Sequence, residues 1–168
     1  MPDFSRVKLF VMDFDGVHTD GKVITDDCGK ESVVCSRRDG MGLEILRNES
    51  DVITCVISKE INQVVAARCR KLKLKYFQGV NDGAGKSKIF LDLINEFGFK
   101  TEETIYMGDD VVDIQPMMLA GIGVAVSDAH PSVKEVASYI TLAAGGNGAI
   151  REICEIILES RASLTISK

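Results

Sequence analysis

The segment 7–17, Val-Lys-Leu-Phe-Val-Met-Asp-Phe-Asp-Gly-Val, constrains the fold of this chain more than any other. Its apolar part has the composition of a strand that is buried on both faces, as in the middle of a parallel sheet. The strand ends in two carboxylates, Asp13 and Asp15. Because residues i and i+2 of a strand point to the same side, these carboxylates should converge at its C-terminal end. Open α/β sheets bind their ligands at that end of the strands.

Two carboxylates this close together repel each other unless a cation neutralises them or one of them stays protonated. A hard, oxygen-seeking ion such as Mg²⁺ is the natural partner for such a pair. The alternative is a surface turn rich in Asp and Gly, which would explain Gly16 but not an acid pair at the end of an apolar strand. The sequence therefore predicts a magnesium site here.

The composition is that of one globular domain over residues 1–168, with 45% hydrophobic and 27% charged residues. The net charge of −5 argues against nucleic acid as the main partner. The five cysteines are odd in number and lack CxxC spacing, which indicates reduced thiols rather than disulfides or a zinc site. No apolar run approaches the length of a membrane span. We expect a soluble, cytoplasmic protein with no membrane contact.

Strand-like and helical segments alternate along the rest of the chain, which predicts an α/β fold with a parallel sheet wound on both faces. Further strands are expected at 52–57, 76–78, 104–107 and 123–126. Helices are expected at 43–47, 61–72 and 89–97, around Pro116, after Pro131, and from the segment 145–152 to about 158. The last residues, about 160–168, are expected to form a loose tail.

Two short strand-like pieces, 22–25 and 31–35, are joined by turn residues and predict a β-hairpin over about 21–36. Both arms carry apolar residues, which a small projecting hairpin cannot bury alone. The hairpin therefore either contacts another subunit or packs on its own domain, and the pattern leaves both possibilities open.

Polar side chains follow the ends of several predicted strands. They are Asp13 and Asp15, then Ser58, then Lys86 beyond a glycine-rich loop, and then Asp109, Asp110 and Asp113. In a parallel sheet all of them lie along one edge, and together they supply the parts that phosphoryl transfer needs. The segment Gly85-Lys86-Ser87 imitates the end of a P-loop, but position 80 is Val instead of the required Gly, so we reject a nucleoside-triphosphatase.

The order Asp-x-Asp-Gly, Ser, Lys, Gly-Asp-Asp-x-x-Asp resembles the haloacid dehalogenase superfamily. The likeness extends over almost the whole chain, through segments 13–21, 38–42, 78–79, 108–110, 128–131 and 145–152. These segments are similar to the branch that contains 3-deoxy-D-manno-octulosonate 8-phosphate phosphatase and the phosphatases of nonulosonate 9-phosphates. The resemblance implies a doubly wound, Rossmannoid sheet with a projecting hairpin and no cap domain.

The resemblance also implies a mechanism. Asp13 is expected to attack phosphorus and form an aspartyl-phosphate, while Asp15 protonates the leaving alkoxide and later activates water. Ser58 is expected to donate a hydrogen bond to a phosphoryl oxygen, and Lys86 to offset the charge of the phosphate and of Asp13.

The expected metal is Mg²⁺, and the resemblance implies its ligands. They are the carboxylate of Asp13, the backbone carbonyl of Asp15 and the carboxylate of Asp109. Asp110 and Asp113 are expected to order the metal-bound waters and the lysine.

The substrate is expected to be the phosphate of a keto-deoxy sugar acid, used in lipopolysaccharide or sialic-acid-like sugar biosynthesis. Octulosonate phosphatases commonly carry Thr-Gly-Arg where this chain has Ser58-Lys59-Glu60. Glu60, Arg68 and Lys71 instead resemble the nine-carbon branch and are candidate substrate-binding residues. For the two cations, a solvated helix flank remains an equal alternative.

Relatives close their sites by forming tetramers, so the resemblance implies a homotetramer with the hairpin in its core. It also implies that the segment 145–148 and the tail lie near a neighbouring site.

The chain departs from the usual pattern of these relatives at two places. His18 replaces a residue that is usually apolar. Gly83-Ala84-Gly85 looks inserted before Lys86, and an insertion there could displace the lysine. An alternative function follows from the second departure: a weakly active module that tetramerises an N-acylneuraminate cytidylyltransferase system.

Overall fold

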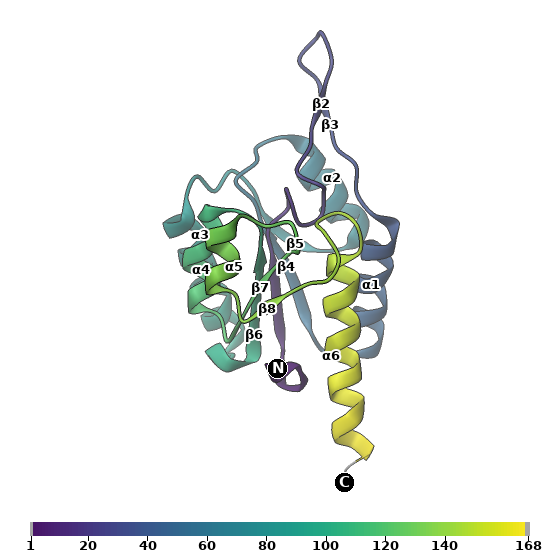
Figure 1. Ribbon diagram of the computed structural model, residues 1–168, viewed down its shortest axis with the longest axis vertical. Helices are drawn as coiled ribbons and strands as arrows, with labels where there is room; N and C mark the ends of the chain where they lie inside the picture. Colours follow the sequence, from purple (N-terminus) through teal and green to yellow (C-terminus); the bar gives the residue numbers. More distant parts are fainter. Residues whose placement is uncertain (1, 167–168) are drawn as a thin grey trace.

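A computed structural model describes the backbone of residues 2–166 and the side chains of residues 2–163, and its centre is a six-stranded sheet (Figure 1). All neighbouring strands in this sheet are parallel, in the order β5-β4-β1-β6-β7-β8. The strands are β1 (Leu9–Met12), β4 (Ile53–Ile57), β5 (Lys75–Phe77), β6 (Thr104–Gly108), β7 (Ile122–Ala125) and β8 (Tyr139–Ile140). The predicted parallel sheet is confirmed, and β8 adds a strand that the sequence did not predict.

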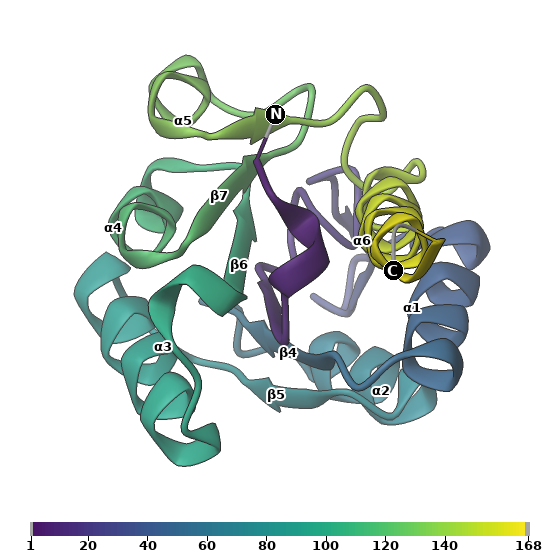
Figure 2. The ribbon, with the colours of Figure 1, turned by 90° about the horizontal axis from the view of Figure 1, so that it is seen from below.

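Helices cover both faces of the sheet, as the predicted doubly wound fold requires. Figure 2 shows α1, α2 and α6 on one face and α3, α4 and α5 on the other. The α-helices are α1 (Arg37–Glu49), α2 (Gln63–Leu72), α3 (Gly83–Phe97), α4 (Ile114–Leu119), α5 (Pro131–Val136) and α6 (Ala149–Ile166). Short 3₁₀ helices are η1 (Phe4–Arg6), η2 (Thr101–Glu103) and η3 (Val111–Asp113). No helix among the described residues is both long enough and apolar enough to cross a membrane.

Strand β1 lies in the interior of the sheet, and its side chains are completely buried. It pairs with β4 on one side and with β6 on the other. The chain builds β4 and β5 on one side of β1 and then crosses over to build β6, β7 and β8 on the other. A reversal of this kind leaves a crevice at the C-terminal ends of the two strands that flank it, here β1 and β6.

Helix α1 is longer than the predicted helix at 43–47, and its two glycines allow close packing, Gly40 on α2 and Gly42 on α6. The side chain of Ser36 caps its first turn by accepting hydrogen bonds from two backbone N–H groups. A glycine inside a helix costs about 1 kcal/mol relative to alanine, so Gly40 and Gly42 favoured a loop prediction. A Cβ at Gly42, however, would lie 2.9 Å from the Cα of Arg151 in α6.

Two other helix starts also differ from the prediction, and in both a capping side chain sets the boundary. Helix α3 begins at Gly83 instead of residue 89, because the Asp82 carboxylate accepts a hydrogen bond from the N–H of Gly85 at 2.7 Å. Helix α2 begins after Asn62, whose side chain accepts from the N–H of Val64. Ile61 therefore precedes the helix and is 75% exposed, instead of lying on its apolar face.

The expected loose tail is wrong for the residues that the structure describes. Helix α6 continues past the predicted end near 158 and includes residues 161–166. The guanidinium of Arg161 donates hydrogen bonds to the Asp51 carboxylate and to the backbone carbonyl of Val7, which ties the helix to the lower end of β1. Residues 167–168 of the predicted tail lie outside the described residues.

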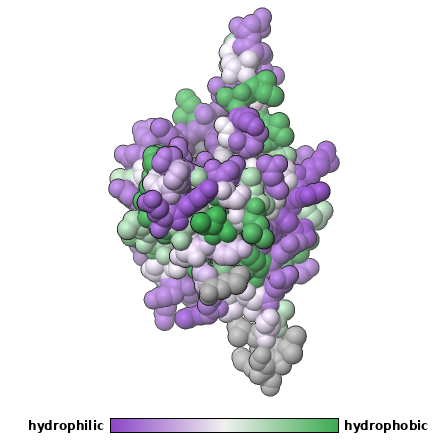
Figure 3. All heavy atoms as spheres, viewed as in Figure 1, coloured by the Kyte–Doolittle hydropathy of each residue, from purple (hydrophilic) through white to green (hydrophobic). Residues whose placement is uncertain are grey.

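The predicted hairpin is present and projects from the end of the molecule where the parallel strands terminate (Figure 1). Its arms are β2 (Ile24–Thr25) and β3 (Glu31–Ser32), which pair antiparallel. Val23, Ile24 and Val34 are 51%, 64% and 66% exposed. Figure 3 shows hydrophobic surface gathered around the base of the hairpin and a hydrophilic tip. Val23, Ile24 and Val34 thus find little cover within one chain, whereas Val33 and Cys35 pack against its core.

Candidate active site

The ends of β1 and β6 bring acids from distant parts of the sequence together. The backbone N–H of Asp13 donates to the carbonyl of Met107 at 2.9 Å, so the pairing of the two strands continues to the first acid. Asp13, Asp109 and Asp113 each offer a carboxylate oxygen, and these oxygens lie within 4.8 Å of one another. Asp113 was expected to order waters and the lysine, and its carboxylate is also part of this close group.

Lys86 lies under this acid cluster and is completely buried. Its Nζ is 2.8 Å from Oδ2 of Asp13 and 2.8 Å from Oδ1 of Asp113. The hydroxyl of Tyr106 also donates to Oδ1 of Asp113, at 3.0 Å. The three residues that look inserted do not displace the lysine: residues 83–85 form the first turn of α3 and place Lys86 at the site.

The charges of the cluster are out of balance, because three carboxylates face a single ammonium group. Burial raises the pKa of Asp13 well above its usual range, and the charge of Asp113 adds to this effect. Burial, followed by repulsion from Asp113 and Asp110, raises the pKa of Asp109 to about 7. Burial alone would lower the pKa of Lys86, but the charges of Asp13 and Asp113 outweigh it and raise the pKa, so the ammonium stays charged. The excess of hard oxygen donors fits a divalent cation such as Mg²⁺.

Asp15 stands on the loop after Asp13 and is half-buried. Burial, and next the charge of Glu60, raise the pKa of Asp15, which favours the protonated form that a general acid needs. Gly16 follows with a φ of +77°, and a Cβ there would overlap the carboxylate of Asp109. Only glycine lets this loop pass so close to the acid cluster.

A cavity of about 480 Å³ opens over these residues. Its lining includes the predicted site residues Asp13, Asp15, Ser58, Glu60, Asp109 and Asp110. The hydroxyl oxygen of Ser58 accepts a hydrogen bond from the N–H of Glu60 at 3.1 Å, which fixes the loop after β4. We call this hollow the active-site cavity.

Arg68 and Lys71, two predicted substrate-binding residues, do not line the active-site cavity. Nη2 of Arg68 donates instead to the carbonyl of Ser36 at 2.8 Å, at the start of α1. Lys71 is exposed on α2. The structure thus separates these cations from Glu60, and one chain alone does not support their predicted contact with substrate.

The segment 145–148 supports the loop that carries Asp15, and its expected place near a neighbouring site stays a prediction. In the structure it packs on the chain's own loop: a Cβ at Gly145 would overlap the carbonyl of Gly16. The Asp39 carboxylate accepts hydrogen bonds from the N–H groups of Gly148 and Arg151, at 3.2 and 2.9 Å, and so caps α6. The segments 38–42 and 145–152 that carried the resemblance are therefore in contact.

His18, the unusual residue after the first motif, is buried beside this loop with 1% exposure. Its ring stacks on Phe14 with centroids 5.4 Å apart, and Nε2 has no hydrogen-bond partner among the described residues. Burial, and then the charge of Arg68, lower the pKa of His18 to about 3, so the ring is neutral at pH 7. It fills the apolar position without titrating near neutrality.

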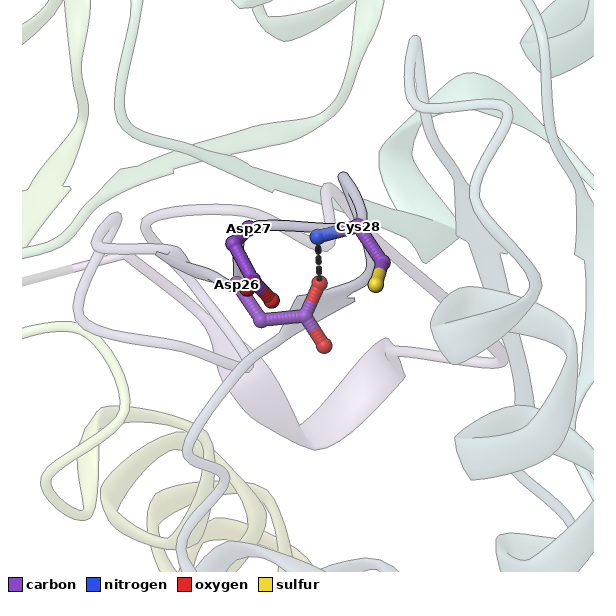
Figure 4. Close-up of side chains that lie close together, drawn as sticks. All are labelled: Asp26, Asp27 and Cys28. Atoms are coloured by element: carbon purple, nitrogen blue, oxygen red, sulfur yellow. Dashed lines mark hydrogen bonds between the residues drawn. The ribbon is translucent and has the colours of Figure 1, made fainter.

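A second group of potential ligands, Asp26, Asp27 and Cys28, lies at the tip of the hairpin (Figure 4). All three are exposed, and the Asp26 carboxylate accepts hydrogen bonds from the N–H groups of Cys28 and Lys30, at 3.0 and 2.8 Å. These bonds are those of a capped turn, which accounts for the acid at this position without a ligand.

Comparisons with known proteins agree with this geometry. Residues 43–153 match the haloacid dehalogenase-like hydrolase family. The 3-deoxy-D-manno-octulosonate 8-phosphate phosphatase KdsC of Escherichia coli K12 is 34% identical over 164 residues, which is 97% of this chain and 85% of that protein.

Solved structures agree as well. A putative haloacid dehalogenase family hydrolase of Streptomyces avermitilis is 39% identical, with a TM-score of 0.88 over 98% of this chain and 91% of that one. The octulosonate 8-phosphate phosphatase of Moraxella catarrhalis, solved with magnesium, phosphate and KDO, is 31% identical, with a TM-score of 0.88 over 98% and 95% of the two chains. The resemblance stated from the sequence is confirmed.

Proposed function

This chain belongs to the haloacid dehalogenase-like hydrolase family, in its KdsC-like branch of phosphatases, and we propose that it hydrolyses the terminal phosphate monoester of a keto-deoxy sugar acid. The observation that supports this most is the buried cluster of Asp13, Asp113 and Lys86 beside Asp109, at the strand ends where phosphate would bind. Phosphoryl transfer depends on positioning and on stabilising charge, and this cluster supplies both.

In the proposed mechanism, Asp13 is the nucleophile. Its Oδ1 accepts from the N–H of Phe14 at 2.7 Å and its Oδ2 lies against Lys86, which together fix the carboxylate at the floor of the active-site cavity. A carboxylate oxygen attacks phosphorus, the bond from phosphorus to the sugar oxygen breaks, and an aspartyl-phosphate forms. Water then attacks the same phosphorus and releases inorganic phosphate and the free carboxylate.

Asp15 is proposed to move the protons. In its neutral form it protonates the departing sugar oxygen, and as a carboxylate it then takes a proton from the attacking water. The hydroxyl of Thr19 contacts Oδ1 of Asp15 at 3.5 Å and helps to orient it. Ser58 is placed to donate its hydroxyl proton to a phosphoryl oxygen, since its own oxygen already accepts from the backbone of Glu60.

The enzyme uses Mg²⁺, which fits the excess of carboxylates in the cluster. We propose that the carboxylates of Asp13 and Asp109 and the backbone carbonyl of Asp15 hold it, and that Asp113 and Asp110 act around it. When bound, the ion neutralises the negative charge that phosphate brings to the acids. Asp113 also keeps Lys86 in place, whether or not it contacts the ion itself.

The proposed substrates are 3-deoxy-D-manno-octulosonate 8-phosphate or a nonulosonate 9-phosphate. The relatives named above favour the first, whereas the resemblance carried by Glu60 favours the second. Their common features are a terminal phosphate, neighbouring hydroxyl groups and an acid group at the far end. The position of Lys86 gives no support to the alternative of an inactive tetramerisation module, because that alternative depended on a displaced lysine.

Measurement of phosphate release with Mg²⁺ tests the substrate class. For octulosonate 8-phosphate or a nonulosonate 9-phosphate we expect kcat/KM at least about a hundredfold above that for glucose 6-phosphate, since a site built to hydrogen-bond its substrate discriminates by such factors. Equal or faster turnover of glucose 6-phosphate would contradict the proposed class. The ratio between the eight- and nine-carbon substrates decides between the two.

We also propose that the chain forms a homotetramer through the hairpin. Exposed apolar residues on both arms support this, because an isolated two-stranded hairpin is marginal in water. Light scattering should give the mass of four chains for the parent protein and a lower mass for Ile24→Asp. Met118→Asp is the matched control, since this α4 residue is as exposed, at 68% against 64%. A tetramer that withstands Ile24→Asp, or one lost equally in both variants, contradicts the role of the hairpin.

A further inference from the structure

A second hollow opens directly beside the active-site cavity. It has a volume of about 240 Å³ and shares three lining residues with that cavity, Asp15, Gly21 and Glu60. The rest of its wall comes from the base of the hairpin and the start of α2. These residues are Lys22, Val23, Glu31, Val33, Asn62 and Val64. We call this hollow the annex; its lining includes the proposed proton donor Asp15 but not Asp13, Ser58 or Asp109.

The position of Glu31, on the hairpin, is fixed from the other wall of the annex. Its Oε2 accepts a hydrogen bond from Nδ2 of Asn62 at 3.1 Å. The same Asn62 caps α2 through its side-chain oxygen, which accepts from the N–H of Val64. Its amide orientation is therefore determined by two bonds, and the bond to Glu31 links strand β3 to the helix 31 residues further along the chain.

Acceptors dominate the polar lining of the annex. Glu31 and Glu60 make no ion pair with any residue that the structure describes, and Nζ of Lys22 pairs with Asp20, at 3.3 Å. Glu60 uses Oε1 to accept from the N–H groups of Ile61 and Asn62. Ionised carboxylates can only accept hydrogen bonds. The annex thus suits a neutral group with several donors and disfavours a second anion.

The chemistry of the reaction determines what enters the annex. Asp15 must contact the oxygen that leaves phosphorus, so the carbons attached to that oxygen extend from Asp15, where the two hollows join. We propose that Glu31, together with Glu60, forms a polyol subsite and accepts hydrogen bonds from hydroxyl groups on the carbons next to the scissile phosphate. This rests on the proposed function and adds Glu31 as a specificity-determining residue. The acid end of the substrate would lie outside the annex.

Comparison of two phosphate esters tests the subsite, one with hydroxyl groups and one without. Glu31→Gln is the sharpest variant, because a glutamine oxygen can still accept from Asn62 while the second carboxylate oxygen becomes an NH₂ donor. For octulosonate 8-phosphate we expect kcat/KM to fall about tenfold or more, mainly through KM, since a hydrogen bond to a charged group is lost. For p-nitrophenyl phosphate we expect a change of less than about twofold. Glu44→Gln, on the exposed side of α1, is the charge-matched control and should change neither.

The possible results separate the inference from the proposed function. If Glu31→Gln lowers kcat/KM equally for both esters, Glu31 is a structural residue. If it lowers kcat/KM for neither ester, the annex has no role in binding. Both results overturn the inference but not the proposed function, because the parent enzyme still hydrolyses the sugar acid. A parent that hydrolyses p-nitrophenyl phosphate but neither octulosonate 8-phosphate nor a nonulosonate 9-phosphate overturns the proposed substrate class, and the polyol subsite with it. Selective loss for the hydroxylated ester supports the subsite.

Discussion

Asp13→Asn is expected to reduce phosphate release by at least about 10⁴-fold, the scale on which a covalent nucleophile contributes to catalysis. An amide in place of the carboxylate has nearly the same shape but cannot attack phosphorus. Lys86 retains its ion pair with Asp113, so the variant should stay folded. The measurement is the rate of phosphate release at saturating substrate and Mg²⁺, with thermal melting as the check on folding.

The control for this experiment is Asp92→Asn. Asp92 is an exposed acid on α3 that pairs with Lys88 at 2.6 Å, and its replacement should leave the rate unchanged. A folded Asp13→Asn protein with a rate within about tenfold of the parent would remove Asp13 from the role of nucleophile. Mass spectrometry of acid-quenched parent enzyme gives an independent test, because only a peptide that contains Asp13 should carry the added phosphate.

Lys86→Met is expected to lower the free energy of unfolding of the metal-free protein by about 3–5 kcal/mol, as when one partner of a buried ion pair is removed. The ammonium is completely buried between Asp13 and Asp113, and without it no cationic side chain among the described residues pairs with these two acids. Urea denaturation in the presence of EDTA measures the loss. Added Mg²⁺ should restore part of the stability, since a cation at the same carboxylates relieves the same repulsion.

Lys88→Met is the matched control, two residues further along α3. Its side chain is 76% exposed and pairs with Asp92 on the surface, where an ion pair contributes about 0–1 kcal/mol. Equal destabilisation by the two variants would contradict the view that Lys86 compensates the cluster. Failure of Mg²⁺ to stabilise Lys86→Met would argue against a metal at Asp13 and Asp109.

The elements that sequence reasoning predicted are those whose signal is local. An apolar run that ends in Asp13 and Asp15 indicates a buried strand and its functional end, because the apolar residues and the two acids are adjacent in the chain. The acids after β6 were found in the same way. Their meeting around one point followed from the parallel sheet, in which all C-terminal strand ends share an edge.

Local composition gave the wrong prediction where tertiary packing requires a residue that is usually found in loops. Gly40, Gly42 and the segment 83–85 have the composition of loops, yet all are helical. In α1 a side chain at Gly42 would collide with Arg151 of α6, and a Cβ at Gly40 would lie 3.1 Å from the Leu72 side chain of α2. Arg68 shares a helix face with Lys71 and seemed available to substrate, but the structure uses its guanidinium to hold the start of α1.

The sequence by itself thus determined the parallel strands other than β8 and the acids that follow β1 and β6, because each of these depends on residues close together in the chain. Tertiary structure alone decided how tightly the loop after β1 is held, which residues share a hollow with Glu60, and that residues 161–166 continue α6. These depend on contacts such as Asp39 with Arg151, Glu31 with Asn62, and Arg161 with Val7. Contacts between segments this far apart leave no periodic signal, since they are set by the distances at which packed helices and loops meet.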